Sequence, residues 1–393
     1  MHSSKQLKSE RQYYLDWLRI ILILTVFLFH IGMIFNTFGW HIKNEEQFPG
    51  LAPIMSFLHL WRMPLLFLIS GAGTYYALGR RSGKQYLKER TRRLLLPLVA
   101  GIFILVPVQV YIERIDQYHS LLDYYTHMFD GVYPSGNFSW HHLWFIAYLY
   151  LISLLISPFL KYFQSKSFRR FKLELEKLVR QPAGMNLIIL PLLITQLLLK
   201  PYFPRETHDI VNDWAFIVYN LTFFMAGFIL FVNPRIIHYL KRQRRIYFSE
   251  AIIASTIWFV SRYYWHLPSY IDELINITVA WSCSVTAIAY AACKLNRNSN
   301  LRKQANQAIY PFYLVHQPVI IGIGYFIIQW NIAVLEKATL VLIFSFLTSS
   351  GIYWYLVRPY NGIRILFGMK KRRTTQKQTT VKAAWYGVLN NGK

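Results

Sequence analysis

The sequence predicts an all-α, polytopic integral membrane protein with about ten transmembrane helices, and three observations support that fold class. The chain has 393 residues, of which 54% are hydrophobic. At least nine apolar runs approach the length that crosses a bilayer. Lysine and arginine gather in every second connection between those runs, so the net charge of +25 reports membrane topology and not nucleic-acid binding. We therefore expect the lipid bilayer as a partner and no nucleic acid.

Ten candidate helices follow from the lengths of the apolar runs. The fifth is the weakest, because it is short and contains Pro191. The expected ranges are about 17–38, 54–79, 94–112, 142–160, 186–200, 214–232, 247–266, 273–293, 308–328 and 338–357.

The charges of the connecting segments agree with this count. The amino terminus and every second connection hold 35 of the 43 lysines and arginines and 6 of the 18 acidic residues, whereas the opposite side holds 6 and 12. By the positive-inside rule both termini face the cytoplasm. We expect a cytoplasmic amino terminus (1–16), a transmembrane domain (17–360) and a basic cytoplasmic tail (361–393) that is disordered or lies on anionic lipid, in an inner or plasma membrane.

The first span carries two ionisable residues, Arg19 and His30, inside one apolar run. Such residues are rare at membrane depth, because insertion costs about 2.5–3.5 kcal/mol for arginine at a helix centre. They are eleven positions apart, which places both on one helix face with about 16 Å of rise between them. Asp16 is three residues before Arg19 and can pair with it. Taken singly, Arg19 is equally interpretable as a snorkelling anchor and His30 as a packing residue.

The second span contains His59, Arg62 and Ser70. His59 and Arg62 are helical neighbours, and Ser70 lies almost on the same face as His59. Arg62 is too deep for easy snorkelling, so we expect it to line a wet or polar cavity. Gly71 and Gly73 favour close helix packing, which is the simplest interpretation of both.

The densest basic block enters the third span and contains Arg90 and Arg93. One interpretation is a stop-transfer or lipid-phosphate patch. The other is a phosphate clamp, because both arginines lie on one face at a helix start and their planar forks bind phosphate bidentately.

Two later spans add polar groups. His142 and Trp144 open the fourth span, where an interfacial belt residue is the simpler interpretation and an outer vestibule the functional one. In the ninth span Tyr313 and His316 are helical neighbours, and Pro318 frees a backbone carbonyl close to them.

Signatures of other chemistries are absent from the sequence. It contains no P-loop, GxSxG or HExxH motif and no cysteine–histidine metal spacing, so no metal is expected. Its two cysteines lie in one apolar segment and indicate no disulfide framework.

The motifs together resemble the acyltransferase 3 family of integral-membrane acyltransferases. Arg19 followed by His30 is similar to the family's R-X10-H motif, and the segments beginning at Arg62, Arg90, His142 and Tyr313 are similar to its later motifs, in the same order. The resemblance extends over roughly residues 10–360. Within the family the sequence is most similar to the glucans biosynthesis protein C branch, which implies succinylation of periplasmic glucans.

The resemblance implies transfer of an acyl group, acetyl or succinyl, from cytoplasmic acyl-CoA to a hydroxyl of an extracytoplasmic carbohydrate. The geometry fits this, because a phosphate-rich head suits the basic face and a long thin arm suits the rise from Arg19 to His30. We expect one corridor through the bilayer that joins these two residues. The alternatives are a transporter or flippase of a glycan or lipid-linked precursor, and a receptor or scaffold.

Roles follow for the candidate residues. His30 is the expected general base or, in a variant mechanism, the acyl carrier. Arg62, Ser70 or His316 stabilises the oxyanion or positions the acyl group. The full set comprises catalytic His30, Arg62 and His316; CoA-binding Arg19, Arg90, Arg93 and Asp16; and substrate-binding Ser70, His59, His142, Trp144 and Tyr313.

Overall fold

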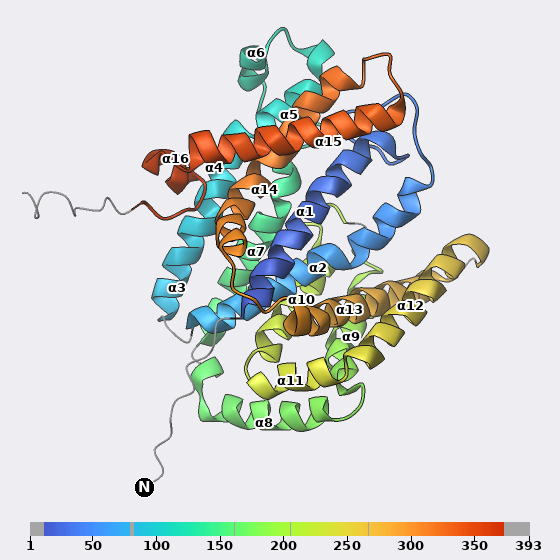
Figure 1. Cartoon of the computed structure of the whole chain (residues 1–393), viewed down its shortest axis with the longest axis vertical. Helices are drawn as coiled ribbons and strands as arrows, with labels where there is room; N and C mark the ends of the chain where they lie inside the picture. Colours follow the sequence, from blue (N-terminus) through green and yellow to red (C-terminus); the bar gives the residue numbers. More distant parts are fainter. Residues whose placement is uncertain (1–11, 79–81, 161, 205, 266, 373–393) are drawn as a thin grey trace, which may run out of the picture.

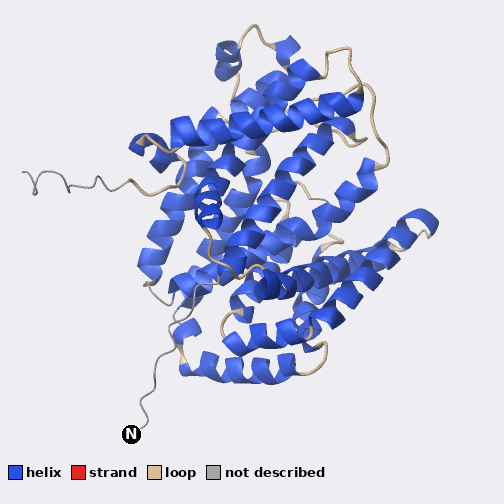
Figure 2. Ribbon diagram, viewed as in Figure 1, coloured by secondary structure: helices blue, strands red, loops and turns tan. Residues whose placement is uncertain are grey.

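The chain folds into helices, as the computed structural model shows for residues 12–78, 82–160, 162–204, 206–265 and 267–372. No strand occurs within these ranges, where only an isolated bridge joins Val132 and Phe138 (Figure 2). The all-α prediction is therefore confirmed. Most of the expected amino terminus (1–16) and basic tail (361–393) lies outside the described residues.

Each expected range contains a helix. The α-helices are α1 (Tyr13–Phe35), α2 (Leu51–Leu78), α3 (Gly83–Arg90), α4 (Leu96–Ile104), α5 (Val106–Glu113), α6 (Leu121–Thr126), α7 (Trp144–Leu155), α8 (Lys166–Arg180), α9 (Leu190–Leu199), α10 (Trp214–Leu230), α11 (Pro234–Arg242), α12 (Arg244–Tyr264), α13 (Ser269–Lys294), α14 (Asn300–Ile327), α15 (Val334–Gly351) and α16 (Asn361–Leu366). Short 3₁₀ turns are η2 (Ile115–Gln117), η3 (His141–Leu143), η4 (Ser157–Leu160), η5 (Tyr162–Gln164) and η6 (Gly184–Ile189), and π-helical turns are η1 (Thr91–Leu95) and η7 (Ile352–Val357).

Among the residues that the structure describes, five helices are long and apolar enough to cross a membrane, and a sixth is added if a bent pair counts as one span. The five are Tyr13–Phe35, Leu51–Leu78, Gly83–Glu113, Ser269–Lys294 and Val334–Val357. The bent pair is α10 with α11, which meet at 100°. The structure therefore supports a membrane protein, whereas ten spans and their orientation stay predictions. Several expected spans are shorter in the structure because turns or prolines interrupt them, as before Leu190–Leu199.

The helices α2 and α10 pack backbone to backbone through two glycines. A Cβ on Gly71 would lie 1.9 Å from the carbonyl oxygen of Phe224, and one on Gly227 would lie 1.8 Å from that of Leu68. Any larger side chain would force these helices apart. The packing interpretation of Gly71 is confirmed, whereas Gly73 has no atom within 4 Å of such a Cβ.

The bundle is elongated, with different short helices at its two ends (Figure 1). Helix α1 packs against α14, α13, α2 and α15 and runs through the middle of the bundle. The short helix α6 lies at one end, and the polar helices α8 and α11 lie together at the other. Helix α1 carries both Arg19 and His30, so it joins the two groups of polar residues that the sequence singles out.

Candidate functional site

A cavity of about 390 Å³, called the inner cavity because it borders the end of α1 that is predicted to be cytoplasmic, is lined in part by basic side chains. Arg19 comes from α1, Arg90 from the end of α3 and Arg93 from the π-helical turn η1 that follows it. Ser70 and Tyr313 also line this cavity. The structure therefore brings the three expected phosphate-binding arginines together around one space.

Neighbouring polar groups hold these guanidinium groups in place. Arg90 donates to the Thr74 hydroxyl at 2.6 Å and lies over the Tyr86 ring at 5.1 Å. Arg93 forms an ion pair with Glu89 at 3.1 Å. These contacts of Arg90 and Arg93 use only some of the five N–H donors of each guanidinium, and both side chains line the cavity.

Asp16 contacts Arg19 as expected, with 3.6 Å between the guanidinium nitrogen and the carboxylate oxygen. Its closer partner is Arg302 of α14, whose side chain is fully buried and also donates to Asn298 at 3.0 Å. Arg19 reaches Asn306 at 3.5 Å. Asp16 therefore joins α1 to α14 as much as it orients Arg19, and no sequence motif indicates this distant partner.

A second, outer cavity of about 720 Å³ is lined mainly by aromatic and imidazole rings. His30 is the residue of α1 that borders it. Trp144 also lines it, and its indole stacks on His208 at 4.5 Å. Burial lowers the pKa of His208 to about 4, so this imidazole is neutral at physiological pH. The other polar lining residues are His41, Glu113, His141, His142, Asp209 and Gln317.

His30 and His316 form a hydrogen-bonded pair, with 2.8 Å between Nδ1 of His30 and Nε2 of His316. His316 Nδ1 lies 2.5 Å from the carbonyl oxygen of Tyr313, which can only accept. The proton of neutral His316 is therefore on Nδ1, and its Nε2 accepts from His30 Nδ1–H. These two hydrogen bonds leave Nε2 of His30 unprotonated, as a general base requires. His30 borders the outer cavity.

The proline in α14 explains the position of His142. Pro318 has no N–H, so the carbonyl of Leu314 four residues earlier lacks its helical donor. Nε2 of His142 lies 3.1 Å from that oxygen and donates to it. The expected free carbonyl is confirmed, and it fixes His142 beside the ring of His316 at 5.4 Å.

Tyr313 lies between the two cavities. It lines the inner cavity, while its ring is 5.8 Å from the His142 ring and 5.6 Å from the His316 ring. Its hydroxyl donates to the backbone carbonyl of His142. Arg19 and His30 therefore border different cavities, and the expectation of one continuous corridor is wrong for this conformation. The aromatic residues of α14 and α7 supply the wall, which helical spacing on α1 alone could not reveal.

Two expected site residues of α2 border neither cavity. Arg62 is buried, and its guanidinium lies over the Phe29 ring at 4.0 Å. Within the described part of the chain, its Nε and Nη1 have no hydrogen-bond partner. His59 pairs with Glu206 at 3.1 Å and also stacks on Phe29. Phe29, an aromatic residue of α1, lies against one face of this guanidinium, and a polar cavity around Arg62 stays a prediction.

Ser70 joins the inner group and not the histidines. Its hydroxyl donates to the carbonyl of Leu66 at 2.8 Å, and it borders the same cavity as Arg19. Sequence reasoning missed His41, Glu113 and His208, because each lies in a loop or at a helix end and meets the others only through tertiary folding.

The arrangement combines a basic cavity, a hydrogen-bonded imidazole pair and a second cavity rich in aromatic rings. The first suits a phosphate-bearing molecule. The second suits abstraction of a proton. The aromatic cavity suits a ligand with both apolar faces and hydroxyl groups, because tryptophan and tyrosine side chains combine an apolar ring with a polar N–H or O–H group.

Comparison with known proteins identifies a family and several distant relatives. A family model described as an acyltransferase domain matches residues 12–357. Glucans biosynthesis protein C of Salmonella paratyphi B is 26% identical over 243 residues, covering 57% of this chain and 59% of the relative. The protein of the same name from Salmonella heidelberg is 25% identical over 245 residues, with the same coverage. The chain thus spans 59% of the length of these curated relatives. No solved structure matches.

Proposed function

Because the chain belongs to the acyltransferase 3 family, we propose that it is a membrane-bound O-acyltransferase acting on an extracytoplasmic glycan. The donor is acyl-CoA, carrying an acetyl or succinyl group, at the cytoplasmic face of an inner membrane. The acceptor is a carbohydrate hydroxyl. The single observation that carries this proposal is the placement of a triple-arginine cavity on one side of the His30–His316 pair and an aromatic cavity on the other.

The inner cavity is the proposed donor site. Arg19, Arg90 and Arg93 face one space, and CoA carries its phosphates at one end of a thin arm. Arginine forks bind phosphate bidentately, so three of them supply both affinity and orientation. The predicted cytoplasmic location of the basic segments is consistent with a cytoplasmic donor.

His30 is the proposed general base. Its Nε2 takes the proton of the acceptor hydroxyl while the hydroxyl oxygen attacks the thioester carbonyl carbon. The tetrahedral intermediate then breaks its carbon–sulfur bond, and the CoA sulfur leaves with the proton that His30 returns. His316 holds the ring of His30 in the required tautomer, so it is a positioning residue.

Arg62 is the proposed partner of negative charge on the acyl group. Within residues that the structure describes, two of its nitrogens, Nε and Nη1, have no acceptor. A buried guanidinium whose nitrogens lack acceptors favours the binding of an anion. The oxyanion of the intermediate and the carboxylate of a succinyl group are both suitable, provided that Phe29 moves aside.

Tyr313 must also move for the reaction to occur. The thioester enters from the cavity of Arg19, whereas His30 borders the other cavity. A rotation of the Tyr313 ring away from His142 would join them. We propose that the acyl arm of the donor displaces this ring as it binds.

The outer cavity is the proposed acceptor site. Trp40, Trp140 and Trp144 line it, and indole rings pack well on the apolar faces of sugars while imidazoles meet their hydroxyls. The relatives named glucans biosynthesis protein C support a glucan as the acceptor class.

Purified protein in lipid nanodiscs provides the test. Acetyl-CoA or succinyl-CoA is supplied with a periplasmic glucan, and mass spectrometry records the mass increment of the glucan. We expect product with the wild-type protein and none above background with His30→Ala. Product formation by a folded His30→Ala variant at a near-normal rate would refute the proposed base.

Thermal stabilisation separates an enzyme from a transporter. Acyl-CoA should raise the unfolding temperature of the detergent-solubilised protein, because the arginine cavity binds it. Stabilisation by free glycan alone, with none by acyl-CoA, would favour a transporter or flippase of glycans.

A further inference from the structure

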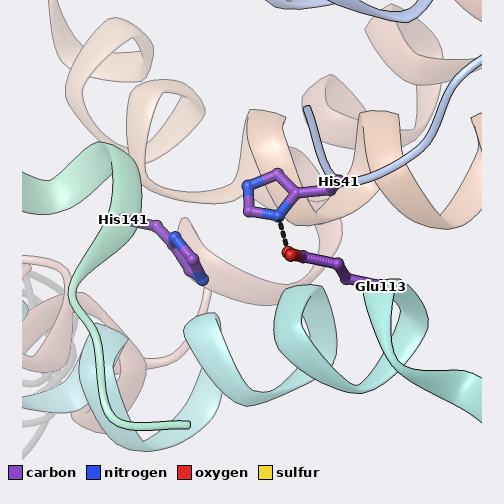
Figure 3. A group of neighbouring side chains, drawn as sticks. All are labelled: His41, Glu113 and His141. Carbon is purple, nitrogen blue, oxygen red and sulfur yellow. Dashed lines mark hydrogen bonds and ion pairs between the residues drawn. The ribbon is translucent and has the colours of Figure 1, made fainter. Parts of the chain in front are cut away.

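Three potential metal ligands converge on the outer cavity (Figure 3). His41 lies in the connection between α1 and α2, Glu113 is the last residue of α5, and His141 begins η3. One ligand atom from each lies within 4.8 Å of the other two. All three residues also line the outer cavity. Three segments far apart in the sequence thus bring two imidazoles and a carboxylate to one point.

The carboxylate of this group is already oriented. One oxygen of Glu113 contacts Nδ1 of His41, and the other accepts a hydrogen bond from the Tyr133 hydroxyl at 3.0 Å. In the described ranges, His41 is its only ion-pair partner within 4 Å. A ligand carboxylate held from behind by a hydroxyl is typical of metal sites, where such partners orient the ligand.

His141 is positioned for the same point, and its backbone N–H donates to the Ser139 hydroxyl at 3.0 Å. Its ring lies 4.5 Å from the His41 ring and 4.7 Å from the Tyr133 ring. Its Nε2 is enclosed and has no hydrogen-bond partner among the residues described. The backbone of His141 is left-handed, with φ of 39°, which residues other than glycine rarely adopt. An enclosed donor or acceptor without a partner calls for a ligand.

Gln317 completes the surroundings of the site. Its amide nitrogen lies 3.2 Å from Nε2 of His41, and its buried Oε1 has no partner within the described residues. If a metal took Nδ1 of His41, the proton of that imidazole would be on Nε2. Turning the Gln317 amide over would then let Nε2–H donate to Oε1, because amide oxygen and nitrogen are nearly identical in shape. Metal binding would thus give partners to His141 Nε2 and Gln317 Oε1, which otherwise have none among the described residues.

We propose that His41, Glu113 and His141 form a site for a divalent transition metal, with Zn²⁺ the best match. Two imidazoles and one carboxylate are a frequent donor set of zinc sites that keep a fourth position open. Mg²⁺ and Ca²⁺ prefer oxygen ligands, so they fit this set poorly. On binding, the proton on Nδ1 of His41 is exchanged through solvent for one on Nε2, and the His41–Glu113 contact is replaced by two metal–ligand bonds.

The open position faces the proposed acceptor cavity. If the proposed transferase function holds, the metal binds a hydroxyl oxygen of the glycan there and lowers the pKa of that hydroxyl. His30 then takes the proton of an already polarised hydroxyl. This role depends on the proposed function, whereas metal binding itself does not.

Metal binding is tested on the full-length protein, purified in detergent through a tag without histidine and treated with a chelator. Isothermal titration with Zn²⁺ should give about one equivalent bound, and Co²⁺ should give the visible absorption of a low-coordinate site. The variants His141→Ala and Glu113→Gln should each lose that equivalent and that absorption. His127→Ala should retain both, because this exposed histidine pairs with Asp130 in the same outer region but lies outside the group.

His141→Asn serves as the second variant if His141→Ala unfolds, and circular dichroism checks the fold of each protein. Absence of the equivalent in the wild type would overturn the proposal. The proposal would also be overturned if folded variants of His141 and Glu113 still bound one equivalent of metal, or if His127→Ala lost that equivalent. Metal binding without acyl transfer would leave this site standing while refuting the proposed function.

Discussion

His30 and His316 lie on different helices, α1 and α14, and share one hydrogen bond of 2.8 Å between Nδ1 and Nε2. Because His316 is in turn fixed by the carbonyl of Tyr313, the free nitrogen of His30 is determined by the backbone of another helix. The reactive tautomer in the proposed mechanism is therefore set by helix packing.

Replacing His316 should slow transfer without abolishing it. His316→Ala removes the acceptor that selects the His30 tautomer, so we expect kcat to fall roughly 10- to 100-fold, part of the about 10²- to 10⁴-fold that a positioned base supplies. KM for acyl-CoA should stay the same, because His316 does not border the inner cavity. Steady-state kinetics measures both. An unchanged kcat would show that the pair does not orient the base.

Arg90 should determine donor affinity. Arg90→Ala removes a guanidinium from the inner cavity, and a charged hydrogen bond contributes about 1.5–3 kcal/mol, so we expect KM for acyl-CoA to rise roughly 10- to 100-fold. Arg92→Ala is the matched control, since this exposed arginine is not among the residues lining the cavity. Equal effects of the two substitutions would indicate general electrostatic attraction instead of a site.

Tyr313 should keep water from the thioester. Tyr313→Ala removes the ring between the two cavities, so acyl-CoA hydrolysis without acceptor should increase relative to transfer. Tyr313→Phe keeps the ring and loses only the hydrogen bond to His142, so it should cost about 1 kcal/mol of stability with little added hydrolysis. Free CoA release, measured with a thiol reagent, distinguishes them. Equal hydrolysis in both variants would locate the barrier elsewhere.

The glycine contact between α2 and α10 should be intolerant of any side chain. Gly227→Ala would place a methyl group against the carbonyl of Leu68, and overpacking of this kind costs at least about 1–3 kcal/mol. The unfolding temperature in detergent should fall. Gly351→Ala is the control, because no atom lies within 4 Å of its added Cβ. Equal unfolding temperatures for the two variants would contradict the close contact.

His208 should make the protein sensitive to acid. Its pKa in the folded protein is lowered to about 4 by burial, with Glu206 raising it and His59 lowering it further. As pH falls below the ordinary value of about 6.5, the unfolded chain binds a proton that the folded protein refuses, so stability is lost down to about pH 4. His208→Gln should flatten the unfolding temperature over this range. The exposed His119→Gln should not, and an identical slope in wild type and His208→Gln would refute the assignment.

The sequence predicts the helical class and most of the donor group well. Apolar length determines where helices occur, and the spacing of Arg19 and His30 on α1 depends only on helix geometry. The contacts that decide chemistry are different, because they join separate segments. Nothing in the sequence near Asp16 indicates Arg302, and nothing near His41 indicates Glu113 or His141.

The wall at Tyr313 is the clearest example of what spacing cannot show. Two residues on one helix face are predicted to share a space only if neighbouring helices leave that space open. Here Tyr313 of α14 fills it. Likewise, the spacing of residues on α2 does not indicate that Phe29 of the neighbouring helix lies against the guanidinium of Arg62.

The separation of the two cavities has a consequence for the energy supply of the cell. A tunnel that joined the cytoplasm to the exterior would let protons and ions leak, and moving one elementary charge across 100 mV releases about 2.3 kcal/mol. With an aromatic plug such as Tyr313 in place, only a molecule that binds and moves the plug opens the way. The proposed transferase would thus pass activated acyl groups across the membrane while the electrochemical gradient is preserved.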